Sequence, residues 1–392
     1  MKFKNSKDSI TFMPCGRIDS NTVMNFSNAI SSNLGEGSKS AIIFDCKDLD
    51  YISSAGLRVL LSLKKKEKAV VKLSNVHGEV NDILEVTGFS QIFDISRGVR
   101  EISGENITLL AKDEDMSLYR MDSDKILKLY KNGTDFETVE NELKYSKAAL
   151  FSGVPTLISY DNVIFKGQYG IVYEMPNSKT VADVIDFKGL SSLARYAEEM
   201  GKALKMIHSC EPEEGILPKT SKIFTMRALK MNKYFHEKEL EKLRTLISII
   251  PDDNKFIYGD YHAGNVFLQG DEIILIDMSR ASCGNPIFDL ARTYMIYVSE
   301  ANLFAKRLTG LDTIKAKKFW DIFIRAYLGS DDEAFIKHQE KIIFAAALLY
   351  SSLIPSFNTL GQENIERFVA NARRDIFPIY DNLLQLLAEA RF

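Results

Sequence analysis

Residues 258–265 read Tyr-Gly-Asp-Tyr-His-Ala-Gly-Asn, and this stretch decides the fold of the larger part of the chain. Asn265 follows Asp260 by five positions, and the apolar run 273–276 leads directly into Asp277. A loop carboxylate, an amide and a second carboxylate at the end of a strand supply one base and two metal ligands. Phosphoryl transfer needs this set, because it depends on positioning and on Mg²⁺, which neutralises phosphate oxygens. The stretch therefore predicts a phosphoryl-transfer site.

The sequence after Asp277 strengthens this prediction. Taken singly, the spacing is weak evidence, because a loop aspartate is usually only a turn residue or a helix cap. Gly284-Asn285-Pro286 and Asp289-Leu290-Ala291 follow, however, and the whole stretch resembles the HGDxHxxN and IDxxxxxxGxPxxDLA signatures of the aminoglycoside phosphotransferase family, to which choline-kinase-like enzymes are related. The resemblance implies a bilobal protein kinase-like fold with an N-lobe sheet and a mainly helical C-lobe.

The resemblance implies a role for each polar residue of this stretch. Asp260 is the expected catalytic base, and Asn265 and Asp277 are the expected Mg²⁺ ligands. Asp289 is expected to be structural, with a carboxylate that accepts backbone N–H bonds and fixes the catalytic loop. His262 is expected to order the loop rather than to act as a base, because Asp260 already fills that role.

Upstream segments match other parts of the family in the expected order. Lys128 lies in 126–130, the third predicted strand of the N-lobe, where the family places the lysine that holds the α and β phosphates of ATP. Glu142 is its expected ion-pair partner. Glu174 and Met175 belong to the expected hinge, whose backbone would bind adenine. Read alone, a strand lysine usually prevents aggregation and a helix glutamate usually faces solvent, but order and spacing outweigh these interpretations.

Two features depart from the family pattern. Tyr258 replaces the usual histidine before Gly-Asp, and the segment 112–117, where the phosphate loop is expected, has no glycine and carries three acids. Glycine normally lets backbone amides approach the phosphates closely, and acidic side chains repel ATP unless they point to solvent. These departures favour an alternative function, in which a catalytically weak or degenerate kinase-like domain senses a nucleotide or metabolite.

The first hundred residues alternate short β-branched runs with amphipathic helical runs, which is the pattern of an α/β domain with one sheet. Strands are predicted over 10–15, 41–45 and 70–73, and helices over 23–34, from 53 or 54 to 64, and from 77 to about 88. Ser53 or Ser54 can cap the second helix, and an N-cap serine is the simpler interpretation of this site. A phosphate on Ser54 would also meet free backbone N–H groups and the positive end of the helix dipole.

Residues 1–98 resemble a STAS domain. The resemblance rests on Gly16-Arg17-Ile18-Asp19, on 42–45, on Ser53-Ser54-Ala55-Gly56-Leu57-Arg58 and on Val86-Thr87-Gly88-Phe89. In anti-sigma factor antagonists of that family, the serine aligned with Ser54 is phosphorylated by a partner kinase, which switches binding off. The resemblance therefore implies a phosphorylation site at Ser54 and an anti-sigma factor or serine kinase as partner. Ser53 stands where many family members carry aspartate.

Length and composition agree with an α/β (α+β) chain of two domains. The chain has 392 residues, which exceeds the size at which a single hydrophobic core stops growing. Hydrophobic residues make up 45% and charged residues 26%, the balance of an ordinary globular protein. We predict a STAS-like regulatory domain over 1–98, a linker over 99–104 and a kinase domain over 105–392, with its N-lobe at about 105–174 and its C-lobe at about 175–392.

Charge, cysteines and hydropathy exclude other classes of protein. The formal net charge of -3 gives no field that attracts nucleic acid. The 4 cysteines are widely spaced, which favours neither a zinc site nor a disulfide framework and indicates a reducing compartment. The longest apolar run, 342–354, is interrupted by serines and is shorter than the roughly 20 residues of a membrane span. We therefore expect a cytoplasmic protein without a nucleic-acid partner or a membrane span.

The expected function is ATP- and Mg²⁺-dependent phosphorylation of a hydroxyl on a small molecule. The sequence does not identify this acceptor, because in the family it docks against variable C-terminal helices, here about 313–392. Choline-like amines, sugars and aminoglycosides all remain open. Trp320, Tyr327 and Tyr350 can form a cage for a cation, but aromatic residues at helical spacing more often belong to the core.

Overall fold

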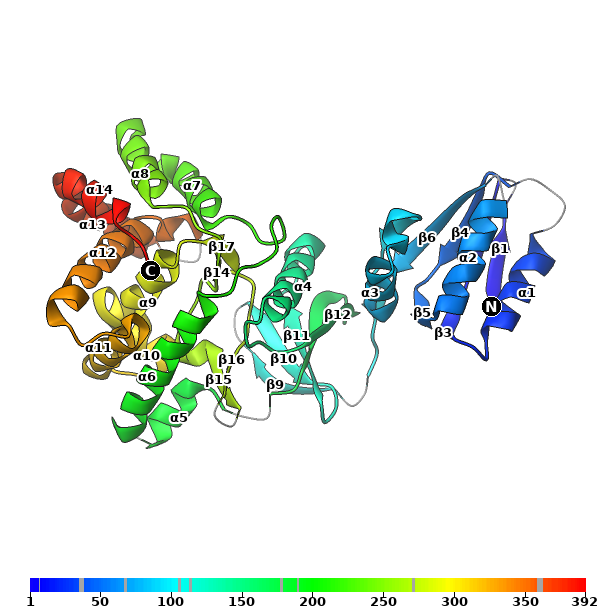
Figure 1. Ribbon diagram of the computed structural model, residues 1–392, viewed down its shortest axis with the longest axis horizontal. Helices are drawn as coiled ribbons and strands as arrows, with labels where there is room; N and C mark the ends of the chain where they lie inside the picture. Colours follow the sequence, from blue (N-terminus) through cyan, green and yellow to red (C-terminus); the bar gives the residue numbers. More distant parts are fainter. Residues whose placement is uncertain are drawn as a thin grey trace. The chain divides into compact units, whose positions relative to one another are not determined.

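A computed structural model describes residues 1–6, 8–34, 39–66, 69–104, 107–112, 115–176, 179–188, 190–269, 272–357 and 362–392, and its elements are labelled in Figure 1. The chain divides into two compact units. The first comprises Met1–Glu140 and Ser159–Met175, and the second comprises Asn141–Ile158 and Pro176–Phe392. Helix α4 (Phe136–Phe151), which the sequence predicts, therefore contributes residues to both units.

The first unit begins with a five-stranded sheet. In spatial order its strands are β1 (Lys2–Asn5), β2 (Ser9–Met13), β4 (Ala41–Asp45), β6 (Val70–Val76) and β7 (Asp94–Arg97). β1 pairs antiparallel with β2, and the other pairs are parallel. The helices of this domain are α1 (Val23–Asn33), α2 (Ser54–Lys66) and α3 (Gly78–Val86). The predicted α/β domain is confirmed, whereas β1 and the small parallel pair of β3 (Cys15–Ile18) and β5 (Asp48–Ile52) were not predicted.

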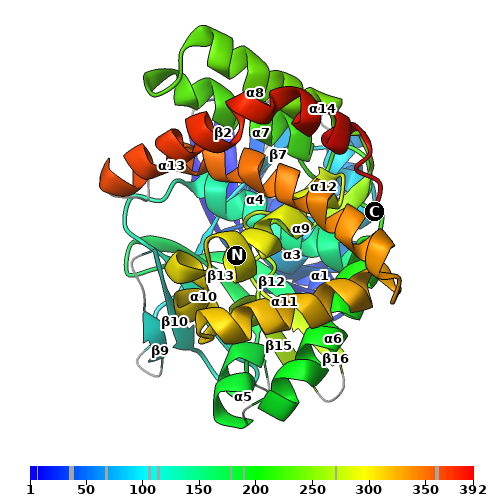
Figure 2. The ribbon, with the colours of Figure 1, turned by 90° about the vertical axis from the view of Figure 1, so that its left-hand side faces the viewer.

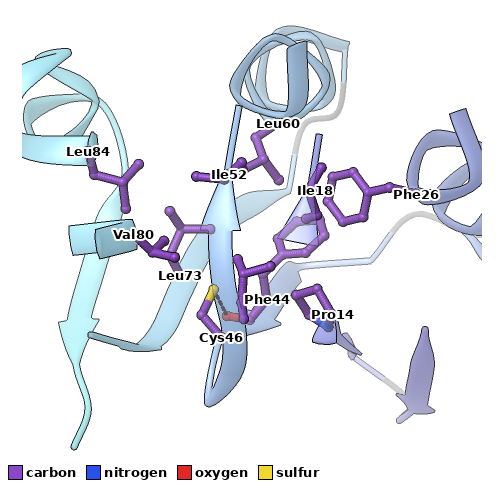
Figure 3. A pocket seen from close by; sticks show the side chains of 11 residues that line it. Pro14, Ile18, Phe26, Phe44, Cys46, Ile52, Leu60, Leu73, Val80 and Leu84 are labelled. Atoms are coloured by element: carbon purple, nitrogen blue, oxygen red, sulfur yellow. Dashed lines mark hydrogen bonds between the residues drawn. The ribbon is translucent and has the colours of Figure 1, made fainter. Parts of the chain in front are cut away.

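The core of this domain is apolar and closely packed. Alternate side chains of β2 and β4 are buried, and the rings of Phe12 and Phe44 stack 5.4 Å apart. The core encloses a void of about 10 Å³. Figure 3 shows the aliphatic and aromatic side chains that line it. The Cys46 thiol beside it contacts the Phe44 carbonyl oxygen at 3.5 Å, and burial raises the pKa of this thiol to about 12. A void of this size and apolar lining is a packing defect rather than a ligand site.

A six-stranded sheet forms the rest of the first unit. In spatial order its strands are β8 (Arg100–Glu101), β12 (Ser159–Phe165), β13 (Gln168–Glu174), β11 (Lys125–Tyr130), β10 (Met116–Arg120) and β9 (Thr108–Lys112). All neighbours pair antiparallel except β8, which pairs parallel with β12. The strand predicted over 126–130, which carries Lys128, is β11. Because β8 falls within 99–104, the predicted linker supplies an edge strand to this sheet.

Contacts within the first unit connect the domains of its two sheets. The backbone N–H of Gly78, at the start of α3, donates a hydrogen bond to Asp161 Oδ1 on β12 at 3.1 Å. The Nδ1 atom of His77 lies 3.7 Å from Asp161 Oδ2, and His77 is buried. Arg97 forms ion pairs with one glutamate of α3 and one of α4. Burial raises the pKa of Asp161, although the imidazole of His77 opposes this shift.

The second unit is mainly helical. Its helices are α5 (Val181–Lys188), α6 (Leu190–Ile207), α7 (Thr220–Lys230), α8 (Glu237–Ile249), α9 (Ile287–Tyr294), α10 (Ala301–Thr309), α11 (Thr313–Leu328), α12 (Glu333–Ser352), α13 (Gln362–Asp375) and α14 (Tyr380–Ala388). Two short antiparallel pairs join β14 (Lys255–Ile257) to β17 (Ser282–Gly284) and β15 (Val266–Gln269) to β16 (Glu272–Leu275). This composition confirms the predicted helical lobe.

The helices of the second unit enclose one hydrophobic core. Helix α11 packs against α6, and α12 packs against α9 (Figures 1 and 2). Trp320, Tyr327 and Tyr350 are all buried in this core, so the core interpretation of these aromatic residues is confirmed. Within the described ranges, no helix is both long enough and apolar enough to cross a membrane.

Candidate active site

The predicted catalytic loop, residues 258–265, connects β14 to β15. A single 3₁₀ turn, Ala263–Asn265, ends the loop. Gly259 adopts a φ of 86°, and a Cβ atom at this position would lie 2.6 Å from the carbonyl oxygen of Arg280. Glycine is required here on both grounds, because other residues rarely adopt this conformation and would also collide with the backbone.

Asp289 fixes the start of this loop from helix α9. Its side chain is fully buried and accepts hydrogen bonds from the backbone N–H groups of Tyr258, at 2.8 Å, and Gly259, at 2.6 Å. His208, directly after α6, contacts the same carboxylate through Nε2 at 3.1 Å and Tyr327 through Nδ1 at 2.8 Å. Each oxygen of this buried carboxylate therefore has hydrogen-bond partners, as a buried charge requires.

Further hydrogen bonds fix the rest of the loop. The Tyr258 hydroxyl donates to the Ile276 carbonyl oxygen, and burial raises the pKa of this tyrosine well above its usual value. Tyr297, in a π-helical turn over Met295–Ser299, accepts a hydrogen bond from the N–H of Ala263 at 3.0 Å. Tyr258 thus ties the loop to the segment that follows β16, which gives a physical role to the residue that departs from the family histidine.

His262 is buried within the loop that it belongs to. Its Nδ1 atom accepts a hydrogen bond from the Gly264 N–H at 3.2 Å, so Nδ1 carries no proton in this arrangement. Burial lowers the pKa of His262, although the nearby Asp260 carboxylate opposes this shift. The Nε2 atom lies 3.9 Å from Asp260 Oδ1. These contacts favour a neutral His262 imidazole, whose Nδ1 atom caps the turn at the end of the loop.

The Asp260 carboxylate is held by two arginine side chains. Arg292 on α9 contacts Asp260 Oδ1 through Nε at 3.0 Å and through Nη2 at 2.9 Å. Arg280 Nε lies 3.7 Å from Asp260 Oδ2. Burial by itself would raise the pKa of Asp260, but the guanidinium groups of Arg292 and Arg280 outweigh burial and hold this pKa well below its usual range. The carboxylate is therefore ionised at neutral pH.

The two predicted metal ligands lie beside this loop. The Asn265 side-chain amide donates to the Asp260 carbonyl oxygen at 3.2 Å, and the Ile276 N–H donates to the Asn265 carbonyl oxygen at 3.3 Å. Asp277 follows directly, with a φ of 62° that is uncommon for a residue other than glycine, and one of its carboxylate oxygens accepts from the Ser279 N–H at 3.1 Å.

The donor chemistry at these two residues fits Mg²⁺. The amide nitrogen of Asn265 is used within the loop, so its amide oxygen and the Asp277 carboxylate are the groups for a cation. Mg²⁺ commonly takes one or two protein oxygens and completes its shell with phosphates and water. Among the residues that the structure describes, no group of three or more His, Cys, Asp or Glu side chains could hold a metal ion.

The predicted phosphate-binding pair is divided between the two units. Lys128 lies on β11 in the first unit with 7% of its surface exposed, and its Nζ atom is 5.2 Å from the ring centre of Tyr130. Glu142 lies on α4 in the second unit with 1% exposed. Neither residue is solvent-facing, so the solvent-facing interpretation of Glu142 is wrong. The ion pair between them stays a prediction.

The predicted hinge lies at the end of β13. Glu174 is the last residue of this strand and pairs with Lys125 of β11. The N–H of Met175 donates to the Asp124 carbonyl oxygen at 2.7 Å. Because this N–H already donates a hydrogen bond within the protein, the predicted contact with adenine would use the Met175 carbonyl oxygen. In the expected phosphate loop, residues 113 and 114 lie outside the described residues, and Asp115 forms an ion pair with Lys131.

Ser54 is the first residue of α2 and is exposed. The capping side chain is that of Ser53, whose Oγ accepts a hydrogen bond from the Gly56 N–H at 3.3 Å. A Cβ atom on Gly56 would lie 2.7 Å from an Ile52 side-chain carbon, so only glycine lets the helix start pack this closely. The Ser54 hydroxyl is thereby free of the capping role.

Sequence reasoning missed the side chains that hold the predicted residues in place. Arg292, Arg280 and His208 are the main ones. A signal was present for the two arginines, since each follows a motif aspartate by three positions, Asp289 and Asp277 respectively. His208 had no such signal, because it is 81 residues from Asp289 in the sequence and meets it only in the folded chain.

The mainly helical lobe, the loop that Asp289 anchors, and the carboxylates of Asp260 and Asp277 together are typical of a phosphotransferase with the protein kinase-like fold. The model of the phosphotransferase enzyme family (APH) matches residues 106–320, more than half of the chain, and the chain therefore belongs to this family. The STAS domain model matches residues 2–102, so the N-terminal module is a STAS domain.

Individual relatives resemble each part of the chain. A stretch of 58 residues is 38% identical to the "Putative anti-sigma factor antagonist BtrV" of Bordetella bronchiseptica, and it covers 14% of this chain and 50% of that protein. The chain thus spans half the length of this curated relative.

Two solved structures resemble the fold. Amicoumacin kinase hAmiN, in complex with AMP-PNP, Ca²⁺ and Ami, has a TM-score of 0.49 and 14% identity, covering 75% of this chain and 93% of that chain. An ADP-bound aminoglycoside phosphotransferase, APH(2'')-Ib, has a TM-score of 0.46 and 13% identity, covering 74% and 95%.

Proposed function

We propose that the chain transfers the γ-phosphoryl group of ATP to a hydroxyl of a small molecule, with Mg²⁺ as cofactor. The observation that carries this proposal is the fixed position of the Asp260 carboxylate. Arg292 Nη2 contacts it at 2.9 Å, and the buried Asp289 anchors the loop on which it lies. Enzymes accelerate phosphoryl transfer mainly by positioning the reacting groups. The Asp260 carboxylate, whose two oxygens contact Arg292 and Arg280, is positioned before substrates bind.

Asp260 would orient the acceptor hydroxyl and accept its proton. The arginine contacts keep this carboxylate ionised, which also makes it a weak base. A weak base suffices, because the transition state of phosphoryl transfer is loose and the hydroxyl loses its proton late. Placing the hydroxyl in line with the leaving oxygen is then the main contribution of Asp260.

Asn265 and Asp277 would hold Mg²⁺, which when bound neutralises charge on the phosphate oxygens. Lys128 would contact the α and β phosphates, and Glu142 would orient Lys128. Both side chains are buried, with 7% and 1% of their surfaces exposed. The order and spacing of these residues along the chain support the proposed pair.

The STAS domain would be the regulatory module. We propose that it binds an anti-sigma factor and that phosphorylation of Ser54 by a partner serine kinase weakens this binding. The exposed Ser54 at a helix start supports the proposal, because a phosphate there meets backbone N–H groups and the positive end of the dipole. The similarity to an anti-sigma factor antagonist supports it independently.

A nucleotide-sensing domain with weak or absent catalysis is the second candidate. The engaged N–H of Met175 and the low basicity of Asp260 favour it. The complete set of Lys128, Glu142 and the loop residues favours catalysis. A test of acceptor phosphorylation separates the two candidates, because both predict nucleotide binding.

Nucleotide binding is tested by thermal unfolding with Mg²⁺-ATP. At a ligand concentration 100 times Kd, binding stabilises the native state by about 2.7 kcal/mol, which raises the unfolding temperature by several degrees. We expect Asp277→Ala to abolish most of this shift. Asp331→Ala, at an exposed residue before α12, is the matched control and should keep it. Equal stabilisation of wild type and Asp277→Ala would contradict the assigned metal ligand.

A further inference from the structure

Two arginine side chains of the second unit contact Asp260, and a third, Arg227, shares the Tyr350 ring with one of them. Arg292 and Arg280 lie 2.9 and 3.7 Å from the Asp260 carboxylate oxygens. The guanidinium carbons of Arg292 and Arg227 lie 5.9 and 6.0 Å from the ring centre of Tyr350. Arg292 thus lies beside both the predicted base and the buried ring of Tyr350, and Arg227 lies beside the same ring.

These arginines come from three separate segments. Arg227 is on α7, Arg280 follows β16, and Arg292 is on α9. Burial lowers the pKa of Arg227, and the positive charges of Arg280 and Arg292 lower it further. Burial by itself would lower the pKa of Arg280, but the Asp260 carboxylate outweighs burial and raises it. The repulsion between like charges therefore falls mainly on Arg227, and a bound anion would offset part of its cost.

We propose that the phosphoryl acceptor is an anionic hydroxyl compound whose phosphate or carboxylate group binds Arg227 and Arg280. Guanidinium groups present paired N–H donors that match the oxygens of such anions, and they hold them more specifically than a point charge does. The proposal rests on the proposed function and narrows it, because choline-like amines and aminoglycosides would meet charge of the same sign.

In the reaction, the acceptor oxygen forms a bond to the γ-phosphorus of ATP while the bond between that phosphorus and the β,γ-bridging oxygen breaks. ADP leaves with the electron pair of this bond. The hydroxyl proton passes to the Asp260 carboxylate and then to water. The arginine group takes no part in bond making, and its role is to place the hydroxyl by holding the anionic end of the same molecule.

The binding test uses inorganic phosphate as probe and titration calorimetry on the full chain. We expect Arg227→Gln and Arg280→Gln to weaken phosphate binding at least about tenfold. Arg280 is the safer variant for folding, since its side chain is 39% exposed. Arg325→Gln, at an exposed arginine paired with Glu333, is the matched control. Lys128→Ala should leave this binding unchanged, whereas phosphate bound in the nucleotide site would depend on Lys128.

The kinetic test compares glucose 6-phosphate, glucose and glucosamine, which share a hydroxylated ring but are anionic, neutral and cationic. We expect the highest kcat/KM with glucose 6-phosphate, and loss of that preference in Arg227→Gln. Equal use of glucosamine, or phosphate binding that ignores both arginines, would overturn the inference and leave the proposed function intact. Arginine-dependent phosphate binding without transfer to any hydroxyl would support the anion site and count against the proposed function.

Discussion

Gly259 shows how strictly the catalytic loop constrains single residues. Its φ of 86° is close to that of Gly215, which is 81°. The two positions differ in space: a Cβ on Gly259 meets the Arg280 carbonyl oxygen at 2.6 Å, whereas a Cβ on Gly215 meets no atom within 4 Å. Alanine substitutions at the two positions therefore separate the cost of a left-handed backbone conformation from the cost of a steric collision.

We expect Gly215→Ala to lower the free energy of unfolding by about 1 kcal/mol, the cost of a left-handed conformation alone. Gly259→Ala should cost at least about 1 to 2 kcal/mol more, because the added methyl group must displace the backbone of Arg280. Chemical denaturation measures both values. Equal losses in the two variants would show that the loop accommodates the methyl group and would contradict the tight fit.

The sequence identified the motif residues at this site but not the contacts that tune them. Asp260 was read from the spacing of the motif, because phosphoryl-transfer chemistry restricts residue identity and order, and Asp289 was read from the resemblance to the family. The low pKa of Asp260 depends on Arg292, 32 residues away, which reaches it only after α9 packs beside the loop. The position of Arg292 three residues after Asp289 marks it as part of the motif, but its contact with Asp260 follows from tertiary packing.

At the scale of elements, the start of α2 places two adjacent serines in different surroundings. Ser53 caps the helix through the Gly56 N–H, and Ser54 is exposed. A change at Ser54 therefore alters surface charge without removing the cap. This division favours Ser54 over Ser53 as the regulated residue.

We expect Ser54→Asp to weaken binding to an anti-sigma factor by at least about 1 kcal/mol through repulsion and desolvation at the contact. Ser54→Ala should bind normally. Ser62→Asp, at an exposed serine further along the same helix, is the control for added charge. Titration calorimetry with the purified partner measures the change. Unaltered affinity in Ser54→Asp would remove this residue from the regulatory surface.

Elements with periodic apolar residues were predictable, and those without them were not. The alternation in β2 and β4 buries Ile10, Phe12, Ile42 and Phe44, so period and burial agree. β1 is exposed along its whole length and reads Lys-Phe-Lys-Asn, which gives no buried face to detect. The two residues of β8 are likewise exposed, and their strand state depends on pairing with β12.

At the scale of the whole molecule, the STAS domain and the N-lobe sheet, which the sequence assigns to separate domains, contact each other within the first unit. The N–H of Gly78 at the start of α3 binds Asp161 of the N-lobe sheet at 3.1 Å, and a buried His77 lies beside the same carboxylate. A carboxylate at a helix start is stabilised by the dipole. This contact joins the start of α3 to the N-lobe sheet within the first unit.

We expect Asp161→Ala to reduce hydrogen-exchange protection of the amides at the start of α3 about fivefold, equivalent to about 1 kcal/mol. Asp94→Ala removes an exposed ion pair with Lys72 and should leave this protection unchanged. Exchange followed by mass spectrometry resolves the segment. Wild-type protection in Asp161→Ala would show that the two domains hold together without this carboxylate.

The most direct test of the central claim is transfer of label from γ-labelled ATP to hydroxyl acceptors by wild type and Asp260→Asn. The isosteric amide keeps the shape of the loop but removes the charge that orients the hydroxyl and accepts its proton. We predict that Asp260→Asn retains Mg²⁺-ATP binding and loses at least about 100-fold in turnover, with label on the small molecule. Unchanged turnover in Asp260→Asn, or label that appears on Ser54 and depends on Asp260, would contradict the account.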